Sequence, residues 1–194
     1  MKVVDIIKQS ATLLDLTEAE KALNNITEEN EGLALSNEDV YCLFNLVKYS
    51  IQELCTNYVP VAAIETVKTY NKAIEINKLT NFIRVQNIYK DEELVKYKII
   101  NRCIYFEEDG EYSVQYATYP QIESLLEEID FLSNFSPDIV VLGLSAYYAL
   151  SKGRFDEFEI YHNQYVEKAE SIKGLKMFNM PQRRWEWEQK KELQ

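Results

Sequence analysis

The chain of 194 residues contains only one histidine, three cysteines, five glycines and four prolines. A single histidine excludes metal sites that are built from several histidines, and no two glycines have the spacing of a phosphate-binding loop. The three cysteines form no C-x-x-C pair, which is typical of free thiols in a reducing compartment. We therefore expect no nucleotide cofactor, no multi-histidine metal centre and no structural disulfide.

Long hydrophobic runs are also missing. The longest run, residues 139–150, is interrupted by Gly143 and Ser145 and is too short to cross a bilayer. The first residues, MKVVDIIKQSATLL, lack the basic start and the long apolar core of a signal peptide. We therefore expect a protein that has no membrane partner and is kept in a cytoplasm or in a particle assembled there.

Positive charge is scarce, because 21 Lys and Arg stand against 32 Asp and Glu and the net charge is −11. A nucleic-acid-binding protein needs a basic face that displaces phosphate counterions, and an anionic membrane repels an acidic surface. The composition therefore argues against both kinds of binding. Tyrosine is abundant, with 14 residues, which favours a large half-buried surface in strands or at interfaces.

Helical periodicity marks the first part of the chain. Apolar residues at helical spacing predict a helix over about residues 3–16, followed by an acidic loop with a weak helix over 17–32. A stronger helix is predicted to begin at Ser36, with Asp39 completing a capping-box-like pair. Its apolar stripe runs to Tyr58, and Pro60 ends it because the residue before a proline avoids the helical region.

Helical periodicity returns after Pro120. Residues 122–129 suggest a short acidic helix, and Ser136-Pro137-Asp138 is a strong helix start. The helix that follows is apolar nearly all round and should end at Gly153. A second, amphipathic helix begins at once and is predicted to end at Gly174, so that the two form an antiparallel hairpin.

Between these helical parts the apolar residues alternate, which predicts five or six short strands. Asp109-Gly110 between two alternating runs predicts a hairpin, and residues 87–92 predict a second turn. The sequence therefore predicts an α+β fold, with a small antiparallel sheet or sandwich inserted into a helical bundle. We expect one domain over residues 1–174 (helical over 1–59, β over 61–120, helical over 121–174) and a C-terminal extension over 175–194. The helix hairpin is expected to pack against the β layer.

Candidate catalytic side chains are few. His162 lies among aromatic residues on the inner edge of its predicted helix, where a structural histidine is a simpler interpretation than a catalytic base. Cys42 and Cys55 share the core face of one helix and Cys103 falls in a strand, which favours inert thiols. We therefore expect no catalytic residues and no cofactor.

The carboxylates Glu107, Glu108, Asp109 and Glu111 gather at the predicted hairpin tip. Such a tip can hold a hard cation, and a bound metal there would favour an enzyme with a carboxylate site. A solvated turn that blunts edge pairing is the simpler interpretation. We therefore predict no metal site.

The C-terminal extension carries the candidate partner-binding residues, Arg183, Arg184, Trp185 and Trp187. Arg and Trp are the residue types most enriched at binding hot spots, and an exposed Trp is otherwise a liability. These residues either dock on a partner or fold back on their own domain as a clasp, and the sequence leaves both alternatives open.

Two phrases of the sequence carry a family resemblance. Ile104 to Phe106 and Tyr116 to Pro120 match an "I-x-Y … Y-x-x-x-P" phrase that ends a hairpin. The helix hairpin matches a second pattern at Pro137, Ala146, Leu150, Gly153, Phe155, Asp156, Tyr161 and Tyr165, with Phe158 where a small residue is more common. Over about residues 1–174 the chain resembles the head–tail connector (adaptor, or head-completion) proteins of tailed bacteriophages and prophages, including the tail-tubular-protein-A-like group.

The resemblance implies a non-catalytic virion structural protein that is assembled in the cytoplasm of a bacterial host. Such proteins form a ring, here expected to be a dodecamer, that joins the portal of the DNA-filled head to tail and neck proteins. DNA would pass through the bore without specific binding, which an acidic wall suits because it does not trap phosphates. The alternative hypothesis is an adaptor or interaction module of a bacterial cytoplasm with an unknown partner.

Overall fold

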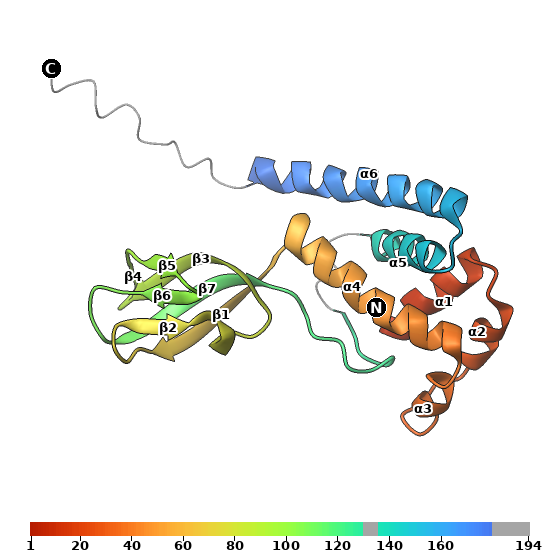
Figure 1. Cartoon of the computed structure of the whole chain (residues 1–194), viewed down its shortest axis with the longest axis horizontal. Helices are drawn as coiled ribbons and strands as arrows, with labels where there is room; N and C mark the ends of the chain where they lie inside the picture. The colour runs from red at the N-terminus through yellow and green to blue at the C-terminus, as the bar shows by residue number, and fades with distance from the viewer. Residues whose placement is uncertain (130–135, 180–194) are drawn as a thin grey trace, which may run out of the picture.

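The computed structural model describes residues 1–129 and 136–179, and it confirms the predicted α+β class. Figure 1 shows two lobes, one made of helices and one of strands, with the chain passing from the first to the second and back. None of the helices in the described ranges combines the length and the apolar character needed to span a bilayer. The helices are α1 (Val3–Leu13), α2 (Thr17–Ala22), α3 (Glu31–Ala34), α4 (Glu38–Asn57), α5 (Asp138–Ser151) and α6 (Phe155–Asn179).

Helix α5 is the centre of the helical lobe and packs against α1, α4 and α6. It is apolar nearly all round, so that burial on several sides is the stable solution for it. The hydroxyls of Ser10 on α1 and Ser145 on α5 satisfy each other in this core at 2.7 Å. The prediction of a central buried helix is therefore confirmed.

Helix α4 begins one residue later than the Ser36 cap predicts. The Asn37 side chain accepts hydrogen bonds from the N–H groups of Asp39 (3.0 Å) and Val40 (3.1 Å). The Ser36 hydroxyl instead donates to the Leu33 carbonyl at 2.6 Å, closing the turn that ends α3. Ser and Asn are both good caps, and the preceding turn decides between them.

The tight link between α5 and α6 is as predicted. Gly153 has a φ of 73°, and Arg154 donates its N–H to the carbonyl of Ala149 at 2.9 Å. This bond, together with the bond from Gly153 N–H to the Leu150 carbonyl, satisfies the free carbonyls at the end of α5. The predicted stop at Gly174 is wrong, because α6 continues to Asn179. A glycine ends a helix where it adopts the left-handed conformation itself, as Gly153 does, whereas Gly174 remains helical.

The acidic helix predicted over 122–129 is absent, since this described segment is irregular, with a turn at Leu125 and Leu126. Its carbonyls at Glu127 and Leu125 accept the N–H groups of Val3 (3.0 Å) and Val4 (2.8 Å). These two N–H groups belong to the first turn of α1, where no partner exists within the helix. The segment therefore caps α1, and its apolar residues Ile122, Leu125 and Ile129 join the helical core.

Seven strands in the described ranges form two antiparallel sheets, ordered β1-β7-β3-β4 and β2-β6-β5. Ile88, Ile104 and Val114 are fully buried in a hydrophobic core that lies between the sheets. This sandwich is the small antiparallel β unit that the alternation predicts. The strands are β1 (Val61–Lys68), β2 (Ala73–Glu75), β3 (Phe82–Lys90), β4 (Glu93–Leu94), β5 (Lys98–Ile100), β6 (Cys103–Tyr105) and β7 (Glu111–Thr118), with a 3-10 turn at Ile76–Lys78.

Both predicted β-turns differ in the structure. Asp109-Gly110 does not close a hairpin, because β6 and β7 belong to different sheets. The Asp109 carboxylate accepts a hydrogen bond from the Lys72 N–H at 2.6 Å. This bond links the connection between β6 and β7 to the turn after β1. Residues 87–90 continue β3, and the turn is confined to Asp91 and Glu92, both with positive φ (51° and 68°).

The helix hairpin does not pack against the β layer, contrary to the expectation. The apolar surface of α5 is buried against α1, α4 and α6, and the β sandwich has a separate core. The lobes are joined where α4 leads through Val59 and Pro60 into β1, and where β7 leads into the irregular segment 119–129. The surfaces of the sandwich that face away from the helices are therefore left open.

Candidate functional site

The predicted partner-binding residues Arg183, Arg184, Trp185 and Trp187 lie outside the described residues. The structure therefore neither joins them to another site nor decides between docking and clasping. The remaining candidates of the sequence, and the exposed surfaces of both lobes, lie within the described ranges.

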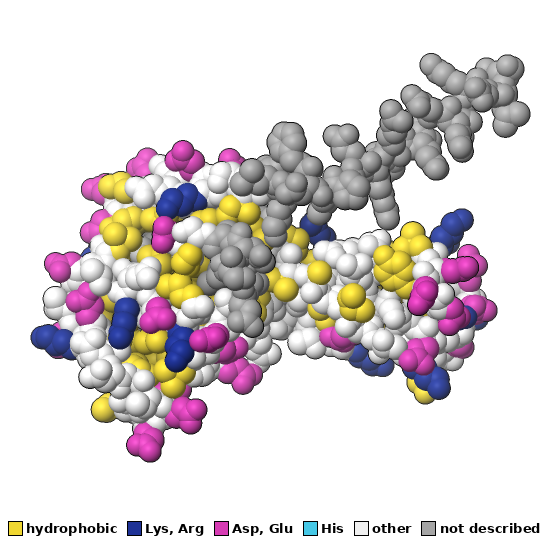
Figure 2. Space-filling model, turned by 180° about the vertical axis from the view of Figure 1, so that it is seen from behind, with side chains coloured by type: hydrophobic (Ala, Val, Ile, Leu, Met, Phe, Trp, Pro, Cys, Tyr) yellow, Lys and Arg dark blue, Asp and Glu magenta, His cyan; other side chains and the backbone are white. Residues whose placement is uncertain are grey.

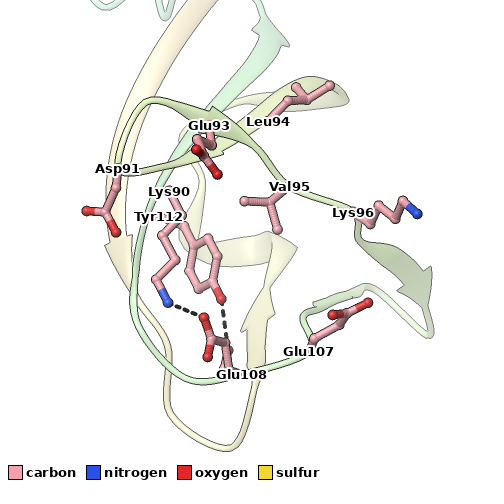
Figure 3. Close-up of a pocket in the computed structure, with 9 residues that line it drawn as sticks. All are labelled: Lys90, Asp91, Glu93, Leu94, Val95, Lys96, Glu107, Glu108 and Tyr112. Carbon is pink, nitrogen blue, oxygen red and sulfur yellow. Dashed lines mark hydrogen bonds and ion pairs between the residues drawn. The ribbon is translucent and has the colours of Figure 1, made fainter.

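The acidic segment 107–111 borders an open hollow of about 840 Å³, shown in Figure 3. Lys90 forms an ion pair with Glu108 across the hollow and lies over the ring of Tyr112, 5.7 Å from its centroid. The hydrogen bond from Lys90 lowers the pKa of Glu108, while Asp109 is engaged by the N–H of Lys72. The described residues bring no three His, Cys, Asp or Glu side chains into a metal-binding cluster. Glu108 and Asp109 are thus already engaged by Lys90 and by the N–H of Lys72.

The surroundings of His162 are aromatic. Its ring lies 5.0 Å from that of Phe158 and 6.3 Å from that of Tyr165, measured between centroids. Cys55 is buried, and Cys42 and Cys103 are half-buried. Three hollows on the described part of the chain, at residues 90–112, 153–157 and 96–107, include neither His162 nor a cysteine. The geometry around the histidine therefore suits a packed side chain.

Hydrogen bonds from tyrosines to carboxylates join α4 to the helix hairpin. Glu53 on α4 accepts from the hydroxyls of Tyr147 (2.5 Å) and Tyr165 (3.3 Å), and Asp39 accepts from Tyr148 (2.5 Å). Burial, followed by the neighbouring carboxylates, raises the pKa of all three tyrosines. In the β lobe the Tyr116 hydroxyl donates to Glu65, and burial raises the pKa of Tyr116 to about 12. These tyrosines remain neutral donors at physiological pH, so the network fixes the orientation of the hairpin.

Replacing Asp39 by asparagine is expected to weaken the protein in a pH-dependent way. Tyr148, and then Lys152 at 3.0 Å, lower the pKa of Asp39 below its usual 3.8. Stability from a carboxylate with a depressed pKa is present above its unfolded pKa and is lost as the pH falls through its folded pKa. Asp39→Asn should cost about 1 kcal/mol at neutral pH, and the difference from the wild type should shrink below about pH 4. Urea unfolding across this pH range measures both quantities.

Glu38→Gln is the matched control for Asp39→Asn. Glu38 lies 3.9 Å from the same Lys152 ammonium, but its side chain is 92% exposed. Exposed ion pairs contribute little, so this variant should behave like the wild type. A difference between Asp39→Asn and the wild type that stayed constant down to about pH 2.5 would contradict the assignment.

A first set of exposed apolar side chains lies where α1 and α5 end and α6 begins. This helical patch consists of Leu13, Leu150 and Phe155, and Phe155 is 68% exposed. The Tyr161 hydroxyl donates to the Leu13 carbonyl at 3.2 Å, which holds the end of α1 beside α6. Residues 155–160 add three acidic side chains and no basic one. The border of the patch thus carries these three acidic side chains together with the basic Lys152 and Arg154, of which Arg154 pairs with Glu157.

A second set lies on the β lobe. This β patch consists of Ile100 on β5 and Tyr105 on β6, both exposed on the outer face of their sheet, whereas Ile99 is exposed on the opposite face of β5. Residues 94–106 contain the basic side chains Lys96, Lys98 and Arg102 and no acidic one. Figure 1 places strands β4 to β6 and the α5–α6 turn at opposite ends of the molecule. The two patches thus differ in charge and lie far apart.

Acidic side chains lie on the surface of both lobes outside the two patches (Figure 2). Figure 2 shows them around the outline of both lobes, with hydrophobic side chains grouped towards the middle of the helical lobe. Residues 1–60 and 121–172 carry twenty Asp and Glu against seven Lys and Arg, whereas residues 61–119 carry nine against eight. Negative charge is therefore concentrated in the helical lobe.

Sequence reasoning missed both patches. Consecutive apolar residues in a strand point to opposite faces, so Ile99-Ile100 was a signal that one of them faces outward. Phe155 fits the apolar period of its helix, which favours an inner position, although as the first residue of α6 it stands beyond the end of α5.

Comparison with protein-family models finds no match, and comparison with curated proteins finds none.

Proposed function

We propose that this chain is a non-catalytic virion structural protein of a tailed phage, which forms a ring that connects the portal to the tail. The observation that carries the proposal is the pair of unlike exposed patches at opposite ends of the molecule. A head-to-tail contact between two different surfaces generates a closed ring when its rotation closes. The family pattern of the helix hairpin, with Gly153 at its turn, supports the same assignment.

The contact in this ring joins the helical patch of one copy to the β patch of the next. Phe155 and Ile100 supply apolar area at its centre, where burial excludes water. The acidic side chains within residues 155–160 lie opposite the basic side chains within residues 96–102 of the next copy. This pairing orients the two copies and disfavours contacts between like patches. The partners are thus further copies of the chain, with the portal and the tail or neck proteins above and below the ring, and DNA in the bore without specific binding.

A pair of complementary variants tests the head-to-tail contact. Ile100→Glu disables the β patch and Phe155→Glu disables the helical patch. In light scattering the wild type should have the mass of a ring, whereas each variant alone should have a much lower mass. An equimolar mixture retains one intact patch contact and should form mixed assemblies but no rings. Rings from either single variant would overturn the head-to-tail arrangement.

The connector assignment itself is tested with the portal. We expect the wild-type ring to bind the portal protein encoded beside it, in a gene neighbourhood that also encodes the major capsid protein. A chain that stays monomeric, binds no portal and lies among unrelated bacterial genes would overturn the proposal. That result would favour the cytoplasmic adaptor instead.

A further inference from the structure

One long sheet edge is open. The two sheets have four edge strands, and β2, β4 and β5 contain only three, two and three residues. Strand β1 contains eight, and it pairs with β7 on one side only. On its other side no backbone hydrogen bond links it to any described residue. A row of backbone donors and acceptors is therefore free to pair with another strand.

Strand β1 has few of the features that normally prevent an edge strand from pairing with another chain. Its register with β7 is continuous over all eight residues, whereas the register of β3 with β7 shifts twice. The strand contains no proline. Its one acidic residue, Glu65, accepts hydrogen bonds from the Tyr116 hydroxyl and the Thr80 N–H, and Lys68 stands at the far end. A long, regular edge without bulges, whose one central charge is engaged by hydrogen bonds, is a template for strand addition.

We propose that β1 pairs with β1 of a second copy of this chain, antiparallel and about a two-fold axis at Ile64. Ala62, Ile64 and Thr66 lie on the exposed face of the strand, and Ile64 is 67% exposed. In this register Ile64 packs on Ile64 of the partner subunit, and Ala62 lies opposite Thr66 of the partner subunit. Directly opposed apolar side chains are the stabilising unit of an antiparallel pair.

The neighbouring register in one direction is disfavoured. If each copy of β1 slides by one residue, the exposed faces of the two strands still match, but the two-fold axis then lies at Glu65. Two carboxylates would then stand directly opposite each other, which destabilises a strand pair. Sliding in the other direction centres the axis on Ala63 and separates the two Ile64 side chains. The sequence of the edge therefore selects the pairing centred on Ile64.

Charge explains why the occupant is a second copy. The helical segments carry a large excess of acidic residues, whereas residues 61–119 carry nine acidic and eight basic residues. Two such molecules repel each other through their helical lobes and meet with least repulsion through their β lobes. A two-fold pair closes on itself, and it uses neither the helical patch nor the β patch. The inference thus does not rest on the proposed function.

Cysteine cross-linking tests the register. In Ile64→Cys the two introduced thiols face each other, so mild oxidation should link most of the chain into dimers. In Thr66→Cys, on the same face, the two thiols would lie about 13 Å apart along the strands and cannot bridge. We expect at least a fivefold difference in dimer yield at equal protein concentration. Equal yields, or no dimer with either variant, would overturn the proposal.

A charge variant gives a second measurement. Ile64→Glu places two carboxylates at the axis and should raise the dimer dissociation constant at least tenfold in light scattering, whereas uncharged Ile64→Thr, which keeps a β-branched side chain there, should raise it by much less. Circular dichroism verifies that both variants fold. Because Ile64 lies outside both patches, Ile64→Glu should still form the patch-dependent assemblies. Cross-linking of Ile64→Cys to a different protein alone would show a foreign strand and overturn the second-copy assignment.

Discussion

Replacing Gly143 by leucine is expected to destabilise the helical lobe by about 3 kcal/mol or more. A Cβ at this position would lie 3.1 Å from Cδ2 and from Cε2 of Tyr165, closer than normal packing allows. Tyr165 cannot move aside freely, because it is 1% exposed and its hydroxyl donates to Glu53. A leucine would therefore separate α5 from α6 and break the hydrogen bond that joins α6 to α4. Urea unfolding followed by helical circular dichroism measures the loss.

Two glycine variants control for effects other than the clash. Gly143→Ala gains about 1 kcal/mol of helix propensity, which offsets the tight contact of a single methyl group, so its stability should change little. Gly32→Leu adds the same side chain where no atom lies within 4 Å of the new Cβ, and it should be nearly neutral. A Gly143→Leu variant as stable as Gly32→Leu would show that Tyr165 does not fix the distance between the helices.

Replacing Ile104 by alanine is expected to destabilise the β lobe by about 2–4 kcal/mol and to leave the helical lobe nearly unchanged. Ile104 is fully buried on β6, the central strand of its sheet, and all its core neighbours belong to the β sandwich. Parts of a protein with separate cores can open with separate free energies. Hydrogen exchange should therefore speed up in β6 and β7 while the amides of α5 keep their protection.

Leu144→Ala is the reciprocal variant. Leu144 is fully buried on α5 in the helical core, so its truncation should lower protection in α4 to α6 and spare β6 and β7. Equal losses in both lobes from either variant would mean that the chain unfolds as one cooperative unit. The pair of variants thus also tests the expectation of a single domain over residues 1–174.

The sequence was sufficient where structure depends on neighbours along the chain. The apolar stripe of α4, the all-round apolar α5 and the left-handed Gly153 each identify their element, because helix periodicity, capping and a positive φ are local properties. Alternation likewise predicted the β region between residues 61 and 120. The α+β class follows from these local patterns in order.

Sequence reasoning failed where backbone groups find partners far away. Residues 122–129 have a helical period, yet their carbonyls accept the first N–H groups of α1 more than a hundred residues earlier. Asp109-Gly110 has hairpin chemistry, yet the strands on either side of it join different sheets. In both cases a tertiary hydrogen bond replaces the local one that the pattern predicts.

The sequence by itself determined that the protein is acidic, α+β and poor in the side chains of catalysis, because composition and period do not depend on contacts between distant residues. Only the tertiary structure decided which apolar residues remain outside. Phe155 fits its local period as a core residue does, whereas Ile100 and Ile64 lie on the outward faces of their strands, and all three are exposed because no other element covers them. Strand order alone left β1 with an open edge, since a strand's second neighbour is set by the whole sheet and not by its own residues.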